Sequence, residues 1–182
     1  MHKASNQAIL IIDMINDFQF NYGPILAKQA EEISHNISSL KKRAKHANYP
    51  IIYINDHYEL WQADFKKIAT KCKNNLSEDI IHRLYPEDDD FFLIKPKHSA
   101  FYGTALNTLL YSLNIKDLII TGLAGNICVL FTANDAYMRE YNLTIPSDCI
   151  ASNTVEDNNF ALKMMENTLK ASIVNSTEIK IN

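Results

Sequence analysis

Short apolar runs separated by longer segments of helical period constrain the fold of this chain more than any other feature. Five runs occupy residues 8–12, 51–54, 91–94, 118–120 and 143–145, with a sixth candidate at 172–174. Each run is apolar throughout instead of alternating with polar residues. This pattern is typical of strands in a parallel sheet that is covered on both faces.

The segments between the runs carry apolar residues three or four positions apart, which predicts amphipathic helices. The expected helices span residues 28–48, 104–113, 126–140 and 155–170, and Thr154 to Asp157 resembles a capping box with Asp in the reciprocal place. Alternating strands and helices predict an α/β class. We expect one domain over residues 1–182, a three-layer doubly wound fold with a six-stranded, mainly parallel sheet between helices.

Residues 74–90 interrupt this alternation and are expected to form a surface excursion before the third strand. Their acidic run, residues 87–90, is interpreted as a solvated loop in preference to a metal site.

Charge and cysteine content narrow the function. The net charge is −3 and no basic stripe with interleaved aromatics is present, so nucleic acid is not an expected partner. The apolar stretch 8–12 is too short for a membrane span or a secretory segment. The three cysteines, Cys72, Cys128 and Cys149, predict neither a disulfide framework nor a CxxC metal site. A reducing, cytoplasmic location is therefore expected.

Polar residues follow the apolar runs at the points where the strands are predicted to end. Asp13 follows the first run, Lys95 the third, and a short turn after the fourth leads to Cys128. Because the carboxyl ends of parallel strands share one edge, where ligands bind, these three side chains are predicted to converge. Each residue also has a non-catalytic explanation, because strand ends often carry polar residues and free cysteine is often buried.

An acid, a lysine and a cysteine together fit a thiol nucleophile. A helix N-terminus and a nearby cation favour the thiolate, so Cys128 at the start of the 126–140 helix and Lys95 are predicted to form an activated pair. Asp13 is predicted to take the thiol proton and pass it to the leaving group. Backbone amides at Ala124 and Cys128 are candidates for holding an oxyanion.

Three segments resemble motifs of the isochorismatase-like cysteine hydrolases, in the order of that family. Residues 8–18 resemble the opening motif, residues 95–104 the lysine motif and residues 121–129 the nucleophile motif. The resemblance covers residues 7 to 155.

The resemblance assigns roles residue by residue. It makes Asp13 the base, Lys95 the lysine and Cys128 the nucleophile, and it selects Lys95 over Lys97 because the family's lysine precedes the motif serine by four positions. It also implies a cis peptide bond between Leu123 and Ala124, which would aim the Ala124 N–H at the oxyanion. A homo-oligomer, dimeric or larger, is a further implication.

The implied reaction is metal-independent and cofactor-free hydrolysis of a C–N bond in a small amide or carbamoyl compound, through a thioester on Cys128. Isochorismatases proper lack the cysteine, so Cys128 argues against their reaction. Nicotinamidases of the family carry an Asp-x-His metal motif, whereas Asp56 and His57 are adjacent here. Nicotinamidase activity stays an alternative, as does a non-catalytic doubly wound binding or assembly module.

The substrate pocket is less well defined by the sequence. Four residues near the motifs are candidate lining residues: Phe18, Asn55, Trp61 and Tyr102. Gly125 and Asn126 replace the Thr-Asp pair that often precedes the family's cysteine, so recognition near the oxyanion turn is open.

Overall fold

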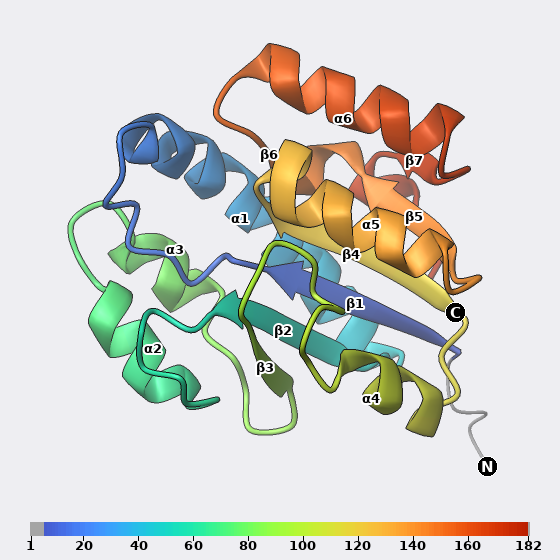
Figure 1. The fold of residues 1–182 in the computed structure, drawn as a ribbon, viewed down its shortest axis with the longest axis horizontal. Helices are drawn as coiled ribbons and strands as arrows, with labels where there is room; N and C mark the ends of the chain where they lie inside the picture. The colour runs from blue at the N-terminus through green and yellow to red at the C-terminus, as the bar shows by residue number, and fades with distance from the viewer. Residues whose placement is uncertain (1–5, 182) are drawn as a thin grey trace.

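A parallel sheet forms the centre of the computed structural model, which describes residues 6–181 (Figure 1). Its strands are β1 (Gln7–Ile12), β2 (Ile51–Asp56), β3 (Phe91–Lys95), β4 (Asp117–Leu123), β5 (Asn142–Pro146), β6 (Ile150–Ala151) and β7 (Ser172–Val174). The order is β3-β2-β1-β4-β5-β7, and the short β6 pairs with β4. The predicted six strands and the α/β class are confirmed, and two-residue β6 is an addition to them.

Helices cover both faces of the sheet, as Figure 1 shows. They are α1 (Gly23–His46), α2 (Phe65–Cys72), α3 (Glu78–Arg83), α4 (Leu106–Ser112), α5 (Leu130–Tyr137) and α6 (Val155–Asn167). A π-helical turn, η1 (Gly125–Val129), leads into α5, and two 3-10 turns, η2 (Ser147–Cys149) and η3 (Ser176–Glu178), lie near β5 and β7. Within residues 6–181, no helix combines the length and apolar character that a membrane span requires.

Alternate residues of the central strands point to opposite faces, so each face has its own core. Ala8, Leu10 and Ile12 of β1 pack with the inner faces of α4, α5 and α6. Ile9 and Ile11 pack with α1 and α3 on the other face. Burial on both faces explains why the strand sequences are apolar without alternation.

The segment 74–90 differs from the expected surface excursion. It contains α3, whose Ile80 is fully buried in the α1-side core, and the preceding segment contains α2, whose Ile68 is also buried. Both helices are shorter than nine residues, too short for their periodicity to be distinguished in the sequence.

The acidic run is exposed at residues 87–89, as expected, whereas Asp90 is less solvated than expected. Asp90 has 1% of its side chain exposed, and its Oδ2 lies 2.6 Å from Lys41 Nζ of α1. Lys45 lies 3.1 Å from the other Asp90 oxygen and also pairs with Glu87 and Asp89. The run is therefore an ion-pair cluster that joins α1 to the start of β3.

The start of α6 follows the predicted capping pattern in part. The Thr154 side chain accepts a hydrogen bond from the Asp157 backbone N–H at 3.0 Å, as an N-cap should. The Asp157 carboxylate accepts from the Thr154 hydroxyl at 2.7 Å instead of returning to the Thr154 backbone.

Candidate active site

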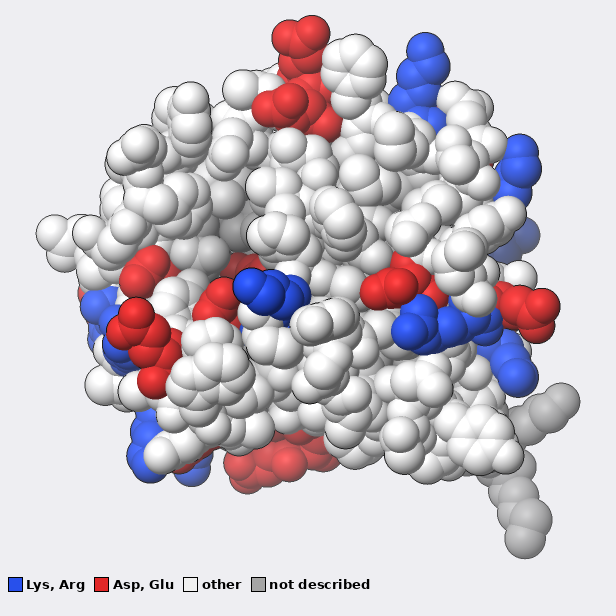
Figure 2. Space-filling view, in the orientation of Figure 1, with Lys and Arg blue, Asp and Glu red and all other residues white. Residues whose placement is uncertain are grey.

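Asp13 lies directly after β1, at the carboxyl edge of the sheet. Its backbone N–H donates to Ile54 O at 3.0 Å, and its φ of 51° turns the chain away from the strand direction. Asp tolerates this left-handed region better than most residues. Gly122 of β4 lies so close that a Cβ there would stand 2.0 Å from Ile12 O, which requires glycine at that position. Figure 2 shows a hollow in the surface near this edge.

Lys95, the last residue of β3, joins the other two predicted residues. Its Nζ lies 2.8 Å from Asp13 Oδ2 and 3.4 Å from Cys128 Sγ. The same ammonium donates to Lys97 O at 3.2 Å, while Asp13 Oδ1 accepts from the Asp56 N–H at 2.9 Å. The structure thus brings Asp13, Lys95 and Cys128 together, and the competing Lys97 has an exposed side chain.

Burial controls the protonation of this group. It raises the pKa of the Cys128 thiol, the Asp13 carboxylate raises it further, and the Lys95 ammonium offsets this only in part, so that the pKa is about 12. For Lys95, burial lowers the pKa, but Asp13 and Cys128 outweigh it and the pKa lies above its usual range. Burial therefore favours the thiol form of Cys128 beside the carboxylate–ammonium pair, and activation of the sulfur by Lys95 stays a prediction.

The segment that presents Cys128 has an irregular backbone. The peptide bond between Leu123 and Ala124 is cis, as the resemblance implies. The following π-helical turn η1 contains Cys128, and its first turn is held by the Asn126 N–H, which donates to Ser152 Oγ at 3.0 Å. Cys128 thus stands at the beginning of the helical segment that continues as α5.

The loop after β3 is fastened to α5 by the motif residues that follow Lys95. The Ser99 hydroxyl donates to the Asp135 carboxylate of α5. The Ala100 N–H donates to Thr132 Oγ1 at 2.9 Å, also on α5. Because α5 continues directly from the turn that carries Cys128, these bonds fix the loop relative to the sulfur.

The bonds from Ser99 and Ala100 to α5 place His98 beside Cys128, a position that the sequence did not predict. His98 lies in the loop, and its Nδ1 is 3.9 Å from Cys128 Sγ. Its ring also contacts Phe131 of α5, with the ring centroids 5.7 Å apart. The one signal for His98 in the sequence is its position directly before Ser99 of the lysine motif.

The four expected pocket residues occupy three kinds of environment. Phe18 is 1% exposed and belongs to the core beside α1. Asn55 is fully buried; its amide binds the backbone N–H and C=O of Ile15, so it fixes the chain after β1. Trp61, 65% exposed, stacks on His57 with centroids 3.8 Å apart, and Tyr102 is 61% exposed. Phe18 and Asn55 therefore have structural contacts, and a place for either in the substrate pocket stays a prediction.

A metal site of the nicotinamidase kind does not fit these residues. Across residues 6–181, no three His, Cys, Asp or Glu side chains gather as metal ligands would. His57 Nδ1 instead accepts a hydrogen bond from the Glu59 N–H at 3.0 Å.

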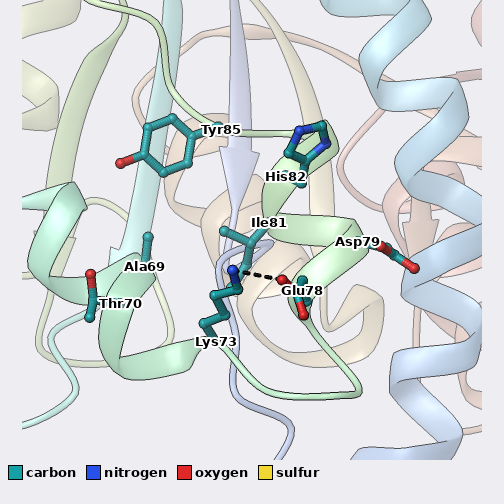
Figure 3. Close-up of a pocket in the computed structure, with 8 residues that line it drawn as sticks. All are labelled: Ala69, Thr70, Lys73, Glu78, Asp79, Ile81, His82 and Tyr85. Carbon is teal, nitrogen blue, oxygen red and sulfur yellow. Dashed lines mark ion pairs between the residues drawn. The ribbon is translucent and has the colours of Figure 1, made fainter.

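A second concave region lies between α2 and α3 (Figure 3). It has a volume of about 450 Å³, and its lining residues are Ala69, Thr70, Lys73, Glu78, Asp79, Ile81, His82 and Tyr85. Lys73 and Glu78 form an ion pair of 2.6 Å across it, with both side chains more than half exposed. It shares no residue with the group around Cys128.

Comparison with known proteins places the chain in a family. The sequence model described as isochorismatase domain matches residues 7–178. The chain belongs to the isochorismatase family. The isochorismatase family protein YaaI of Bacillus subtilis (strain 168) is 62% identical over 179 residues, covering 98% of each chain. The protein is thus an isochorismatase-family hydrolase.

Solved structures agree with this fold. The nicotinamidase SaPncA of Staphylococcus aureus superposes with a TM-score of 0.75 at 23% identity, over 93% of this chain and 99% of the other. The N-carbamoylsarcosine amidase of Thermoplasma acidophilum gives a TM-score of 0.74 at 23% identity, over 96% and 98%. At this identity the likeness concerns the architecture of the isochorismatase family.

Proposed function

We propose that this isochorismatase-family protein is a cysteine hydrolase that cleaves a C–N bond of a small amide or carbamoyl compound, without a metal. The observation that carries the proposal is the position of Lys95 Nζ, 2.8 Å from the Asp13 carboxylate and 3.4 Å from Cys128 Sγ. All three groups belong to the carboxyl edge of the sheet, where ligands bind in such folds.

The first half of the reaction forms a thioester. The Cys128 thiol hydrogen-bonds the Asp13 carboxylate, which takes its proton as Sγ attacks the substrate carbonyl carbon. Because the thiol is protonated at neutral pH, transfer to this base accompanies the attack. The Lys95 ammonium stabilises the negative sulfur as the proton leaves.

Collapse of the tetrahedral intermediate breaks the C–N bond. Backbone N–H groups of Ala124 and Cys128 are assigned to the oxyanion, since they flank the turn that presents the sulfur. Asp13 returns its proton to the departing nitrogen, which leaves as ammonia or an amine. Water then hydrolyses the thioester to a carboxylic or carbamic acid and the free thiol.

A panel of small amides, ureas and carbamoyl compounds, nicotinamide included, tests the proposal by ammonia release. We expect at least one compound to be hydrolysed, with turnover unaffected by a chelator and abolished in Cys128→Ala. A Cys128→Ala variant that keeps the wild-type rate would end the assignment. Loss of turnover with chelator would favour a metal-dependent amidase of the nicotinamidase type.

A further inference from the structure

The surroundings of Cys128 Sγ divide into a buried side and an exposed side. Asp13 and Lys95 are 7% and 3% exposed and form the buried side. His98 is an exposed residue, yet its Nδ1 lies 3.9 Å from the same sulfur. Of the polar side chains that the structure describes beside Sγ, His98 is therefore the exposed one.

The two buried groups already have hydrogen-bond partners on the sides away from the sulfur. The Asp13 carboxylate accepts from Lys95 at one oxygen and from the Asp56 N–H at the other. Lys95 is an ammonium with no lone pair to accept a proton. A neutral imidazole has one acceptor nitrogen and titrates near neutral pH, which suits it for general base catalysis.

We propose that His98 is a catalytic residue of the second half-reaction. Its Nδ1 takes a proton from the water that attacks the Cys128 thioester, and it returns that proton to Sγ as the C–S bond breaks. The proposal rests on the proposed function, because it presumes acyl transfer to Cys128. In this scheme Asp13 gives a proton to the leaving nitrogen in the first half-reaction, and His98 takes a proton from the incoming water in the second.

The geometry suits this second step. A separation of 3.9 Å is long for a direct hydrogen bond but allows one water molecule to lie within reach of the imidazole and of a carbon bonded to the sulfur. The ring is held in place by its contact with Phe131, and its loop is fastened to α5 through Ser99 and Ala100. His98 is thus positioned by the same helical segment that carries the nucleophile.

Several charged and titratable groups lie on the elements near His98. They are Cys128 on η1, Asp13 after β1, Lys95 and Lys97 on its own segment, and Asp135 and Arg139 on α5.

The experiment uses p-nitrophenyl acetate as the acyl donor, because its leaving group needs no proton. The wild type should release a rapid burst of p-nitrophenolate as Cys128 is acetylated, followed by slower turnover. In His98→Gln the burst should keep its rate and amplitude, while turnover falls about 100-fold. Mass spectrometry should find acetylated Cys128 accumulating in this variant.

Two further variants serve as controls for the effect of His98→Gln. His35→Gln removes an exposed histidine of α1, 62% of whose side chain is exposed, and should behave as the wild type. His98→Ala should regain turnover when free imidazole is added, which a loss of loop structure would not permit. Circular dichroism of both His98 variants checks that each is folded.

Each other outcome has a definite meaning. Turnover of His98→Gln equal to that of His35→Gln overturns the role of His98, and so does an equal loss in burst and turnover. If the wild type gives no burst, or Cys128→Ala keeps it, the nucleophile assignment itself is wrong. If the burst depends on Cys128 but His98→Gln turns over like the wild type, the proposed function stands and only the role of His98 is wrong.

Discussion

Two buried lysine–aspartate pairs lie at opposite ends of strand β3, and they differ in what surrounds them. Lys41 and Asp90 meet at its beginning, 2.6 Å apart, with 6% and 1% of their side chains exposed. Lys95 and Asp13 meet at its end, 2.8 Å apart, with 3% and 11% of their side chains exposed. Distance and burial alone therefore do not distinguish the two pairs.

Their remaining neighbours do distinguish them. Lys41 is also bound by the Tyr53 hydroxyl at 3.2 Å and by Glu87 at 3.1 Å, so protein oxygens surround its ammonium. Lys95 instead faces the sulfur of Cys128, a group that can react. A pair whose partners are all unreactive serves stability, whereas a pair that faces a nucleophile can move protons and charge.

The largest effect is expected from Lys95→Met. The substitution removes the charge that stabilises the developing thiolate and keeps a chain of similar length. The burst rate with p-nitrophenyl acetate should fall about 100- to 1000-fold, as when one electrostatic group of an active site is removed. A burst within threefold of the wild type, taken as a rough margin, would contradict the assigned role.

Lys41→Met tests the other pair. It leaves Asp90 buried with Lys45 and the Glu87 N–H as its remaining partners, so unfolding in urea should lose about 3 kcal/mol. Turnover per folded molecule should stay unchanged. Lys45→Met is the matched control, because its partners Glu87 and Asp89 are 59% and 75% exposed and its loss should cost below about 1 kcal/mol. Equal losses in both variants would show that burial does not set the contribution of these pairs.

The sequence predicts the parallel sheet and also the proximity of Asp13, Lys95 and Cys128. Both features follow from repeated, local sequence signals. Apolar runs mark strands, and parallel strands bring their carboxyl ends to one edge. The position of Lys95 then follows from its place as the last residue of β3. Strand β6, with two residues, carries too short a signal to be detected.

The features that escaped prediction depend on contacts between distant segments. His98 reaches the sulfur because Ser99 and Ala100 are bonded to α5, more than thirty positions away. Asp90 is buried because Lys41 on α1 covers it, 49 positions away. The protonation of Cys128 follows from burial, which residue types at a helix start do not reveal.

Asp13→Asn separates the resting effect of the carboxylate from its role during turnover. The carboxylate raises the pKa of the Cys128 thiol, so its removal leaves Lys95 alone beside Sγ and favours the thiolate. Iodoacetamide should then label Cys128 about three- to tenfold faster than in the wild type for each unit by which the thiol pKa falls.

Peptide mapping at neutral pH measures this labelling, with the buried Cys72 and Cys149 as internal references. Wild-type labelling should keep rising with pH through the range 7–10, roughly the interval below a thiol pKa of about 12. Turnover of Asp13→Asn should nevertheless fall, because the amide cannot take the thiol proton. Labelling at or below the wild-type rate would mean that the carboxylate favours the thiolate. In that case the carboxylate would act on the sulfur by holding the Lys95 ammonium beside it, a role that Asp90 has no sulfur to play.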